Sequence, residues 1–102
     1  MAILERMIQR VYDDKWEAVL AQEKEWDALE ARVGGFPKKR RYRGFASPHS
    51  TEFIVFEREW PSLAAYEAAY GRLNVAPGYQ ELSQAGDQLK AGVHVELYFV
   101  LE

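Results

Sequence analysis

The sequence contains no cysteine and only two histidines among its 102 residues. Without thiols, disulfide bonds, thiolate catalysis and cysteine-based zinc sites are excluded. The two histidines, His49 and His94, lie far apart in the chain, and no ligand spacing typical of a protein metal site is present. We therefore expect a protein that uses no metal ion and no cofactor.

Long apolar runs and a strong charge of one sign are also missing. No segment approaches the ~20 apolar residues that span a membrane, and Glu5 and Arg6 interrupt the region where a secretory signal would be continuously apolar. A formal net charge of -3 provides no long-range attraction for nucleic acid or an anionic membrane. We expect a cytoplasmic protein that binds neither.

Apolar and aromatic residues are plentiful. The chain is 48% hydrophobic and 14% aromatic, which is enough for one globular core at this length. No linker, internal repeat or low-complexity tract divides it. Residues 1–102 are therefore predicted to form a single domain.

The period of the hydrophobic pattern changes along the chain in the order strand, helix, strand, strand, helix, strand. The pattern predicts strands at 2–12, 37–46, 51–60 and 93–101, helices at 13–33 and from 61 or 62 onward, and a short helical segment after Pro77-Gly78 that ends at Gly92. This order predicts an α+β fold with a ferredoxin-like antiparallel sheet and its helices on one face.

Both faces of the predicted sheet carry apolar residues. The third strand is apolar at four consecutive positions, 53–56, and the last strand alternates Val93, Val95, Leu97 and Phe99 as its core face with a mixed second face. Helices on one side would leave the other apolar face in water, which monomers rarely tolerate over several hundred Å². We therefore expect a homodimer that buries sheet against sheet.

The junction between the third strand and the second helix carries a resemblance to a known family. Glu59-Trp60-Pro61-Ser62-Leu63, running into Ala64-Ala65-Tyr66-Glu67, resembles the dimeric α+β barrel superfamily, and within it the NIPSNAP-like and antibiotic-biosynthesis-monooxygenase-like small proteins. The resemblance implies a homodimer whose sheets close into a barrel, with a pocket in each subunit between sheet and helices. Similar proteins include cofactor-free oxygenases of aromatic substrates, haem-degrading enzymes, lactone isomerases and proteins of no known activity.

The haem-degrading branch has residues that this chain lacks. Those enzymes pair an Asn on the first strand with a Trp on the second helix and a His about three turns later. Here the first strand has no Asn, Tyr66 occupies the Trp-like position and Ala76 the His-like position. Haem degradation is therefore disfavoured.

Three residues of the last strand form the candidate catalytic group. His94, Glu96 and Tyr98 alternate along the strand and point the same way. An imidazole beside a carboxylate is a general base near neutral pH, and a phenol can donate to a developing oxyanion. In the alternative interpretation these side chains are polar residues of a partly hydrated dimer interface.

The candidate substrate-binding residues are aromatic and basic. Trp60, Tyr66 and Tyr70, with Tyr79 nearby and Trp26 on the first helix, are suited to stacking on a flat ligand. Ordinary core packing is the better explanation for at least half of the aromatic cluster. Arg41 and Arg43, from the basic run 38–43, are candidates for an anion clamp. The alternative is that this run protects a sheet edge and pairs with glutamates of the neighbouring strand.

Two function classes follow. The first is an enzyme or carrier for a small, flat, weakly acidic molecule, in which His94 abstracts a proton and the anion isomerises or reacts with oxygen without a cofactor. The second is a non-catalytic dimerisation or interaction domain. Glu23 and Glu30 lie on the tryptophan-bearing stripe of the first helix, where a buried carboxylate could act as a general acid. The alternatives are a position at the margin of the stripe or a contact with an arginine of the sheet.

Overall fold

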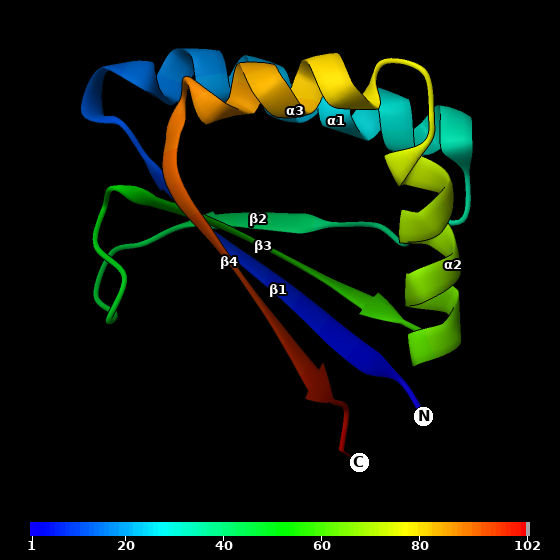
Figure 1. The fold of residues 1–102 in the computed structure, drawn as a ribbon. Helices are drawn as coiled ribbons and strands as arrows, with labels where there is room; N and C mark the ends of the chain where they lie inside the picture. Colours follow the sequence, from blue (N-terminus) through cyan, green and yellow to red (C-terminus); the bar gives the residue numbers. More distant parts are fainter. Residues whose placement is uncertain (102) are drawn as a thin grey trace.

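Four antiparallel strands form one sheet in the order β2-β3-β1-β4 in a computed structural model that describes residues 1–101 (Figure 1). The strands are β1 (Ile3–Val11), β2 (Arg40–Arg43), β3 (Phe53–Trp60) and β4 (Lys90–Phe99). β1 lies in the centre and pairs Ile3 with Trp60 on one side and with Phe99 on the other. This topology is the predicted ferredoxin-like α+β fold.

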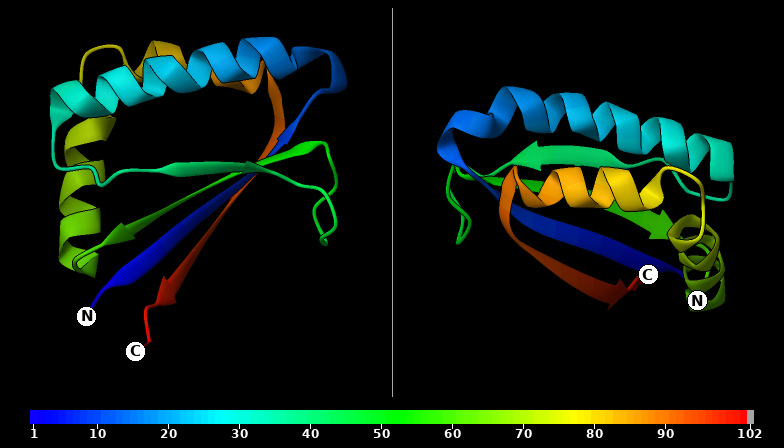
Figure 2. Two further views of the ribbon diagram at one scale, coloured as in Figure 1. Left: turned by 180° about the vertical axis from the view of Figure 1, so that it is seen from behind. Right: turned by 45° about the horizontal axis from the view of Figure 1, so that its top comes forward.

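The helices cover one face of the sheet. They are α1 (Trp16–Val33), preceded by the 3-10 turn η1 (Asp13–Lys15), then α2 (Leu63–Asn74) and α3 (Tyr79–Asp87). α1 and α3 run side by side over the sheet, whereas α2 stands across one end of it (Figure 2). Among residues 1–101, no helix is both long and apolar enough to cross a membrane.

Local sequence signals explain where the helices begin and end. α1 stops at Gly34, whose φ of 82° lies in the left-handed region that favours glycine. Ser62 precedes α2, and its hydroxyl accepts a hydrogen bond from the Ala65 amide at 3.1 Å. This bond satisfies one of the free amides of the first helical turn.

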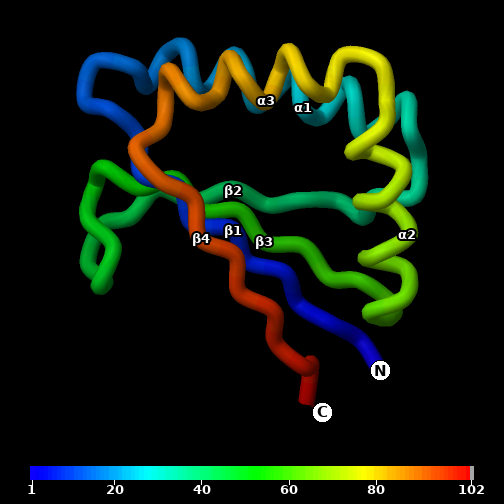
Figure 3. Tube along the Cα trace, in the orientation of Figure 1, coloured from blue at the N-terminus to red at the C-terminus, as the bar shows by residue number. Residues whose placement is uncertain are grey.

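The largest differences from the predicted boundaries are in β2 and at the start of β4. β2 is only Arg40–Arg43, and the segment that follows it projects beyond the strands before the chain returns as β3 (Figure 3). Gly92 lies inside β4 and does not end the preceding helix, which stops at Asp87. Glycine at a strand position is compatible with an extended backbone, so it is an ambiguous helix stop.

Two clusters of buried apolar residues lie at opposite ends of the sheet. One cluster contains Ile3, Trp60 and Ala69, with Tyr66 and Tyr70 packed against it, and the other contains Val11, Val19 and Ile54. The helix-facing residues of β1 between the clusters are Glu5, Met7 and Gln9. The middle of the molecule is therefore not a continuous apolar core.

β4 corrects one sequence expectation. Val93, Val95, Leu97 and Phe99 were predicted as its core face, but they are 59%, 41%, 43% and 69% exposed. The period of two is present, and the four residues do share a face. They stay exposed because β4 is an edge strand and the short helix α3 covers only its beginning.

Candidate functional site

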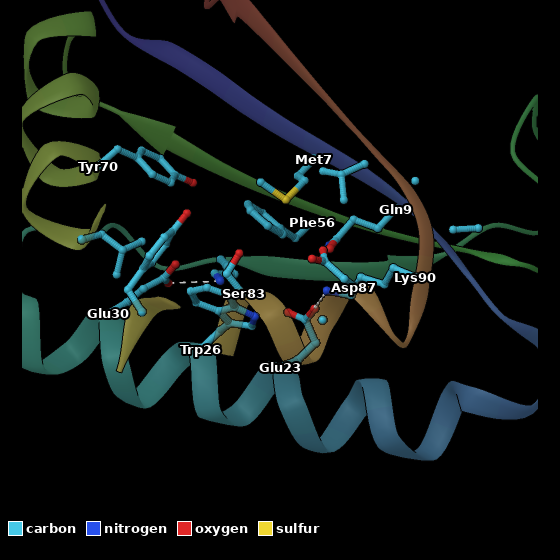
Figure 4. Close-up of a pocket in the computed structure, with 17 residues that line it drawn as sticks. Met7, Gln9, Glu23, Trp26, Glu30, Phe56, Tyr70, Ser83, Asp87 and Lys90 are labelled. Carbon is cyan, nitrogen blue, oxygen red and sulfur yellow. Dashed lines mark hydrogen bonds and ion pairs between the residues drawn. The ribbon is translucent and has the colours of Figure 1, made fainter. Parts of the chain in front are cut away.

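A cavity of about 440 Å³ lies between the sheet and the helices, in the space between the two apolar clusters (Figure 4). Its walls come from both layers of the fold. β1, β3 and β4 form its floor, and α1 and α3 form its roof. It is the size of a pocket for a small organic ligand.

Aromatic side chains form much of the wall. Trp26 of α1 and Tyr79 of α3 meet edge to face with ring centroids 5.6 Å apart. Phe56 of β3 lies on the sheet side, and Tyr70 of α2 lies at one end (Figure 4). Rings in these positions favour a flat, apolar ligand.

A chain of ion pairs of alternating sign crosses this region. Its acidic members on α1 are Glu23, Asp27 and Glu30, which share the sheet-facing side of the helix because they are spaced by four and three residues. The basic members and the last acid come from the sheet and its flanks. The order is Lys90, Glu23, Arg41, Asp27, Lys39, Glu30, Arg58 and Glu5, and we call these eight residues the charge ladder.

The ladder begins at the α1 and β4 side of the cavity. Lys90 Nζ is 3.1 Å from one carboxylate oxygen of Glu23, and Arg41 Nη2 is 2.9 Å from the other. Arg41 also donates to Asp27 at 2.8 Å. This contact holds the pKa of the Asp27 carboxyl below its usual value, although partial burial opposes the shift.

The side chains in the other half of the ladder are largely buried, and those of Arg58 and Glu5 have no exposed surface. Lys39 Nζ is 3.1 Å from Glu30, and Arg58 donates to Glu30 at 2.9 Å and to Glu5 at 2.7 Å. Trp60 Nε1 donates to Glu5 at 2.9 Å, and the Tyr70 hydroxyl donates to the same carboxylate. Burial is the main cause that raises the pKa of the Tyr70 phenol well above its usual range.

The ladder is electrically balanced. It contains four cations and four carboxylates, and each member contacts at least one group of opposite charge. Glu23, Glu30, Lys39 and Lys90 also line the cavity. A fifth charged residue of the lining, Asp87 of α3, is exposed and has no ion pair with any residue of 1–101.

The structure divides the predicted substrate-binding residues. Tyr70 and Trp26 line the cavity, whereas Trp60 and Tyr66 pack against each other in the first apolar cluster with centroids 5.5 Å apart. Arg41 belongs to the ladder, so its charge is already neutralised. Arg43 lies 4.0 Å over the ring of Trp16 and donates to the Thr51 carbonyl.

The predicted catalytic group lies on the face of the sheet that the helices do not cover. His94 Nε2 is 3.2 Å from Glu96, and the Tyr98 hydroxyl donates to Glu96 at 2.6 Å, so these three side chains do come together. The hydrogen bond from Tyr98 is the main cause that lowers the pKa of Glu96. None of the three lines the cavity, because they alternate with the helix-facing residues of β4.

Sequence reasoning missed most of the ladder. The pairing of Glu23 with an arginine of the sheet was one of the alternatives expected, but Arg41 was not named as that partner, and Glu5 and Arg58 were not singled out. A signal was present, because both residues alternate in register with apolar residues at inward positions, Ile3 and Met7 on β1 and Phe56 and Trp60 on β3. Opposite charges at inward positions of neighbouring strands indicate a buried ion pair.

The described residues offer no protein metal site, since residues 1–101 contain no group of three potential ligands close enough to hold an ion. The cavity chemistry therefore consists of carboxylates, ammonium groups, hydroxyls and aromatic rings. Such a set can orient a polar aromatic molecule and accept a proton from it.

Comparison with known proteins supports the fold by structure alone. No protein-family model matches the chain, and no curated protein matches it. Among solved structures, a NIPSNAP family protein from Agrobacterium tumefaciens strain C58 is similar with a TM-score of 0.83 and 16% identity, covering 100% of this chain and 95% of that one. A NIPSNAP domain protein from Burkholderia xenovorans gives 0.80 at 13% identity, covering 97% and 94%.

A structure of known activity is also similar. SnoaB, a cofactor-independent oxygenase from Streptomyces nogalater, gives a TM-score of 0.74 at 16% identity, and the match covers 99% of this chain and 94% of SnoaB. At these identities the likeness concerns the fold. The chain therefore has a ferredoxin-like α+β fold similar to that of the NIPSNAP proteins and of SnoaB, as the sequence resemblance predicted.

Proposed function

We propose that this protein binds a small, flat, enolisable or aromatic molecule in the cavity between sheet and helices, and converts it without a cofactor. The cavity itself carries the proposal. It has the volume of a ligand site, aromatic walls and a few polar groups that converge on the same space. The fold shared with a cofactor-independent oxygenase agrees with this chemistry but does not define it.

The proposed reaction begins with removal of a proton from the ligand. Asp87 is the proton acceptor in this proposal, because Glu23 and Glu30 each already accept from an arginine and a lysine. Asp87 lines the cavity and has no such donor among residues 1–101. The resulting enolate or phenolate then isomerises or reacts with molecular oxygen.

Ligand binding is tested by calorimetric titration with 2-naphthol, a flat aromatic alcohol. We expect one site per chain. Replacing Ser83, which lines the cavity from α3, by Trp fills the space and abolishes binding. The matched control is Gln84→Trp, at an exposed position of the same helix. Equal binding by both variants would place the site elsewhere.

Catalysis needs a separate test, because a carrier would bind without turning the ligand over. Oxygen consumption or product formation is measured for a ligand that co-purifies with the protein. Asp87→Asn is expected to reduce turnover about 10²-fold or more, the usual contribution of a general base, while binding changes little. Unchanged turnover in Asp87→Asn would remove the assigned role.

We also propose that two copies of the chain form a homodimer. β4 exposes apolar residues on the face towards the helices, and the polar row His94, Glu96 and Tyr98 lies on its other face. A second copy covering this strand would bury both, with the polar row in a hydrated interface. Native mass spectrometry is expected to show a dimer, and Leu97→Glu to convert it to a monomer; a wild-type monomer would contradict the proposal.

A further inference from the structure

We infer that the ligand of this cavity carries no net charge, and that the charge ladder sets this specificity. The inference rests on the proposed function, since it describes the ligand of the same cavity. Carboxylates, phosphates and amines are excluded.

Apart from Asp87, the charged groups that line the cavity are already neutralised by ion pairs within the chain. The side chains of Lys39 and Lys90 are only 5% and 8% exposed. Lys39 lies 3.1 Å from Glu30 and 3.6 Å from Asp27, and Lys90 lies 3.1 Å from Glu23. Each ammonium group therefore already has a carboxylate partner. An anionic ligand would supply no missing counter-charge.

The acidic side of the lining is equally occupied. Glu23 is held by Lys90 and Arg41, and Glu30 by Lys39 and Arg58. A cationic ligand would have to compete with a guanidinium and an ammonium at either carboxylate. Asp87 is the exception, but it is exposed, so water screens its charge.

Bringing a further charge into this space costs hydration free energy. An ion that leaves water for a site without a free counter-charge loses its hydration and gains no new ion pair that would offset this loss. An uncharged ring system loses much less. Its carbonyl or hydroxyl oxygen can still accept a hydrogen bond, because an ammonium group has three donors and Lys90 has one carboxylate contact among residues 1–101.

The aromatic contacts agree with this assignment. Lys39 Nζ lies 4.5 Å from the ring centroid of Phe56, so the cation is stabilised by the wall as well as by Glu30 and Asp27. A ligand that slides between Phe56 and Trp26 meets a polar but balanced surface. Hydrogen bonds then orient the ligand, and burial of its apolar surface provides most of the affinity.

The test compares three ligands of similar shape near neutral pH: uncharged 2-naphthol, anionic 2-naphthoate and cationic 2-naphthylmethylammonium. We expect 2-naphthol to bind about tenfold more tightly than either ion, or better, in calorimetric titrations. Tighter binding of 2-naphthoate or of the ammonium compound would overturn the inference but leave the binding site in place. Failure of all three to bind would overturn the proposed function and this inference together.

Lys90→Met tests the ladder itself. The variant removes one cation but leaves Glu23 paired with Arg41, so this carboxylate keeps a counter-charge while the lining of the cavity loses one positive charge. The ammonium compound is expected to gain about tenfold in affinity, with 2-naphthol changed only slightly. Lys39→Met is the independent second variant, since Glu30 keeps its contact with Arg58.

The matched control is Lys24→Met, which removes an exposed lysine of α1 that has no ion pair among residues 1–101. It changes the net charge of the protein by the same amount as Lys90→Met. An equal gain for the ammonium compound in the control would show a long-range effect of net charge and would contradict the role of the ladder. No gain in either cavity variant would contradict it as well.

Discussion

The guanidinium of Arg58 donates to the Glu5 carboxylate at 2.7 Å, and neither side chain has any exposed surface. The pair joins β3 to β1 at a helix-facing position, where Arg58 and Glu5 are directly opposite in the register. A buried pair of this kind contributes less than its attraction suggests, because both ions lose their hydration on folding. Breaking it is costly, however, because the remaining ion stays buried without its partner.

Arg58→Met is therefore expected to lower the free energy of unfolding by about 3–5 kcal/mol. The variant leaves Glu5 and Glu30 without their guanidinium partner. Urea unfolding followed by circular dichroism measures the change. The control is Arg10→Met, which breaks an exposed pair with Glu52 and is expected to cost less than about 1 kcal/mol. Similar losses in the two variants would contradict this account.

Trp60→Phe tests the polar contact of the indole. Trp60 Nε1 donates to Glu5 at 2.9 Å, so phenylalanine keeps an aromatic ring but removes a hydrogen bond to a buried carboxylate. We expect a loss of about 1.5–3 kcal/mol from that bond, with a further loss from the smaller ring. Trp26→Phe is the comparison, because the Trp26 indole donates to no other residue of 1–101. A larger loss of stability in Trp26→Phe than in Trp60→Phe would contradict the contribution assigned to the hydrogen bond between Trp60 and Glu5.

Asp27 makes stability depend on acid pH. The hydrogen bond from Arg41 keeps the pKa of Asp27 in the folded protein below its ordinary value of 3.8. Its contribution is therefore fully present above about pH 4 and is lost as the pH falls through the folded-state pKa. Asp27→Asn should lower stability at neutral pH and flatten its acid dependence below pH 4. Asp14→Asn, at an exposed carboxylate, should leave that profile unchanged.

The start of α2 depends on one hydroxyl. Ser62 accepts a hydrogen bond from the Ala65 amide at 3.1 Å, so Ser62→Ala is expected to destabilise the protein by about 1 kcal/mol. Ser62→Asn should restore most of the loss, because an amide oxygen can cap the same amide. Thermal unfolding of the three proteins measures the difference, and failure of Asn to exceed Ala would argue against capping.

Periodicity and junction residues were sufficient to predict the order of elements. The alternation of β4, the glycine stop of α1 and the serine start of α2 are local signals, and the structure contains each of them. Local rules work here because backbone geometry fixes which side chains share a face. They could not place His94 relative to the cavity, since a period of two does not say which face the helices cover.

The sequence by itself determined the fold class, the order of the strands and helices, and which side chains share a face within a strand. Only the tertiary structure decided that Glu5, Glu30 and Arg58 would meet in the interior, and that the residues around them would enclose a cavity. The physical reason is distance along the chain. Ion pairs between residues more than twenty positions apart depend on how the layers pack, and no local preference specifies that packing.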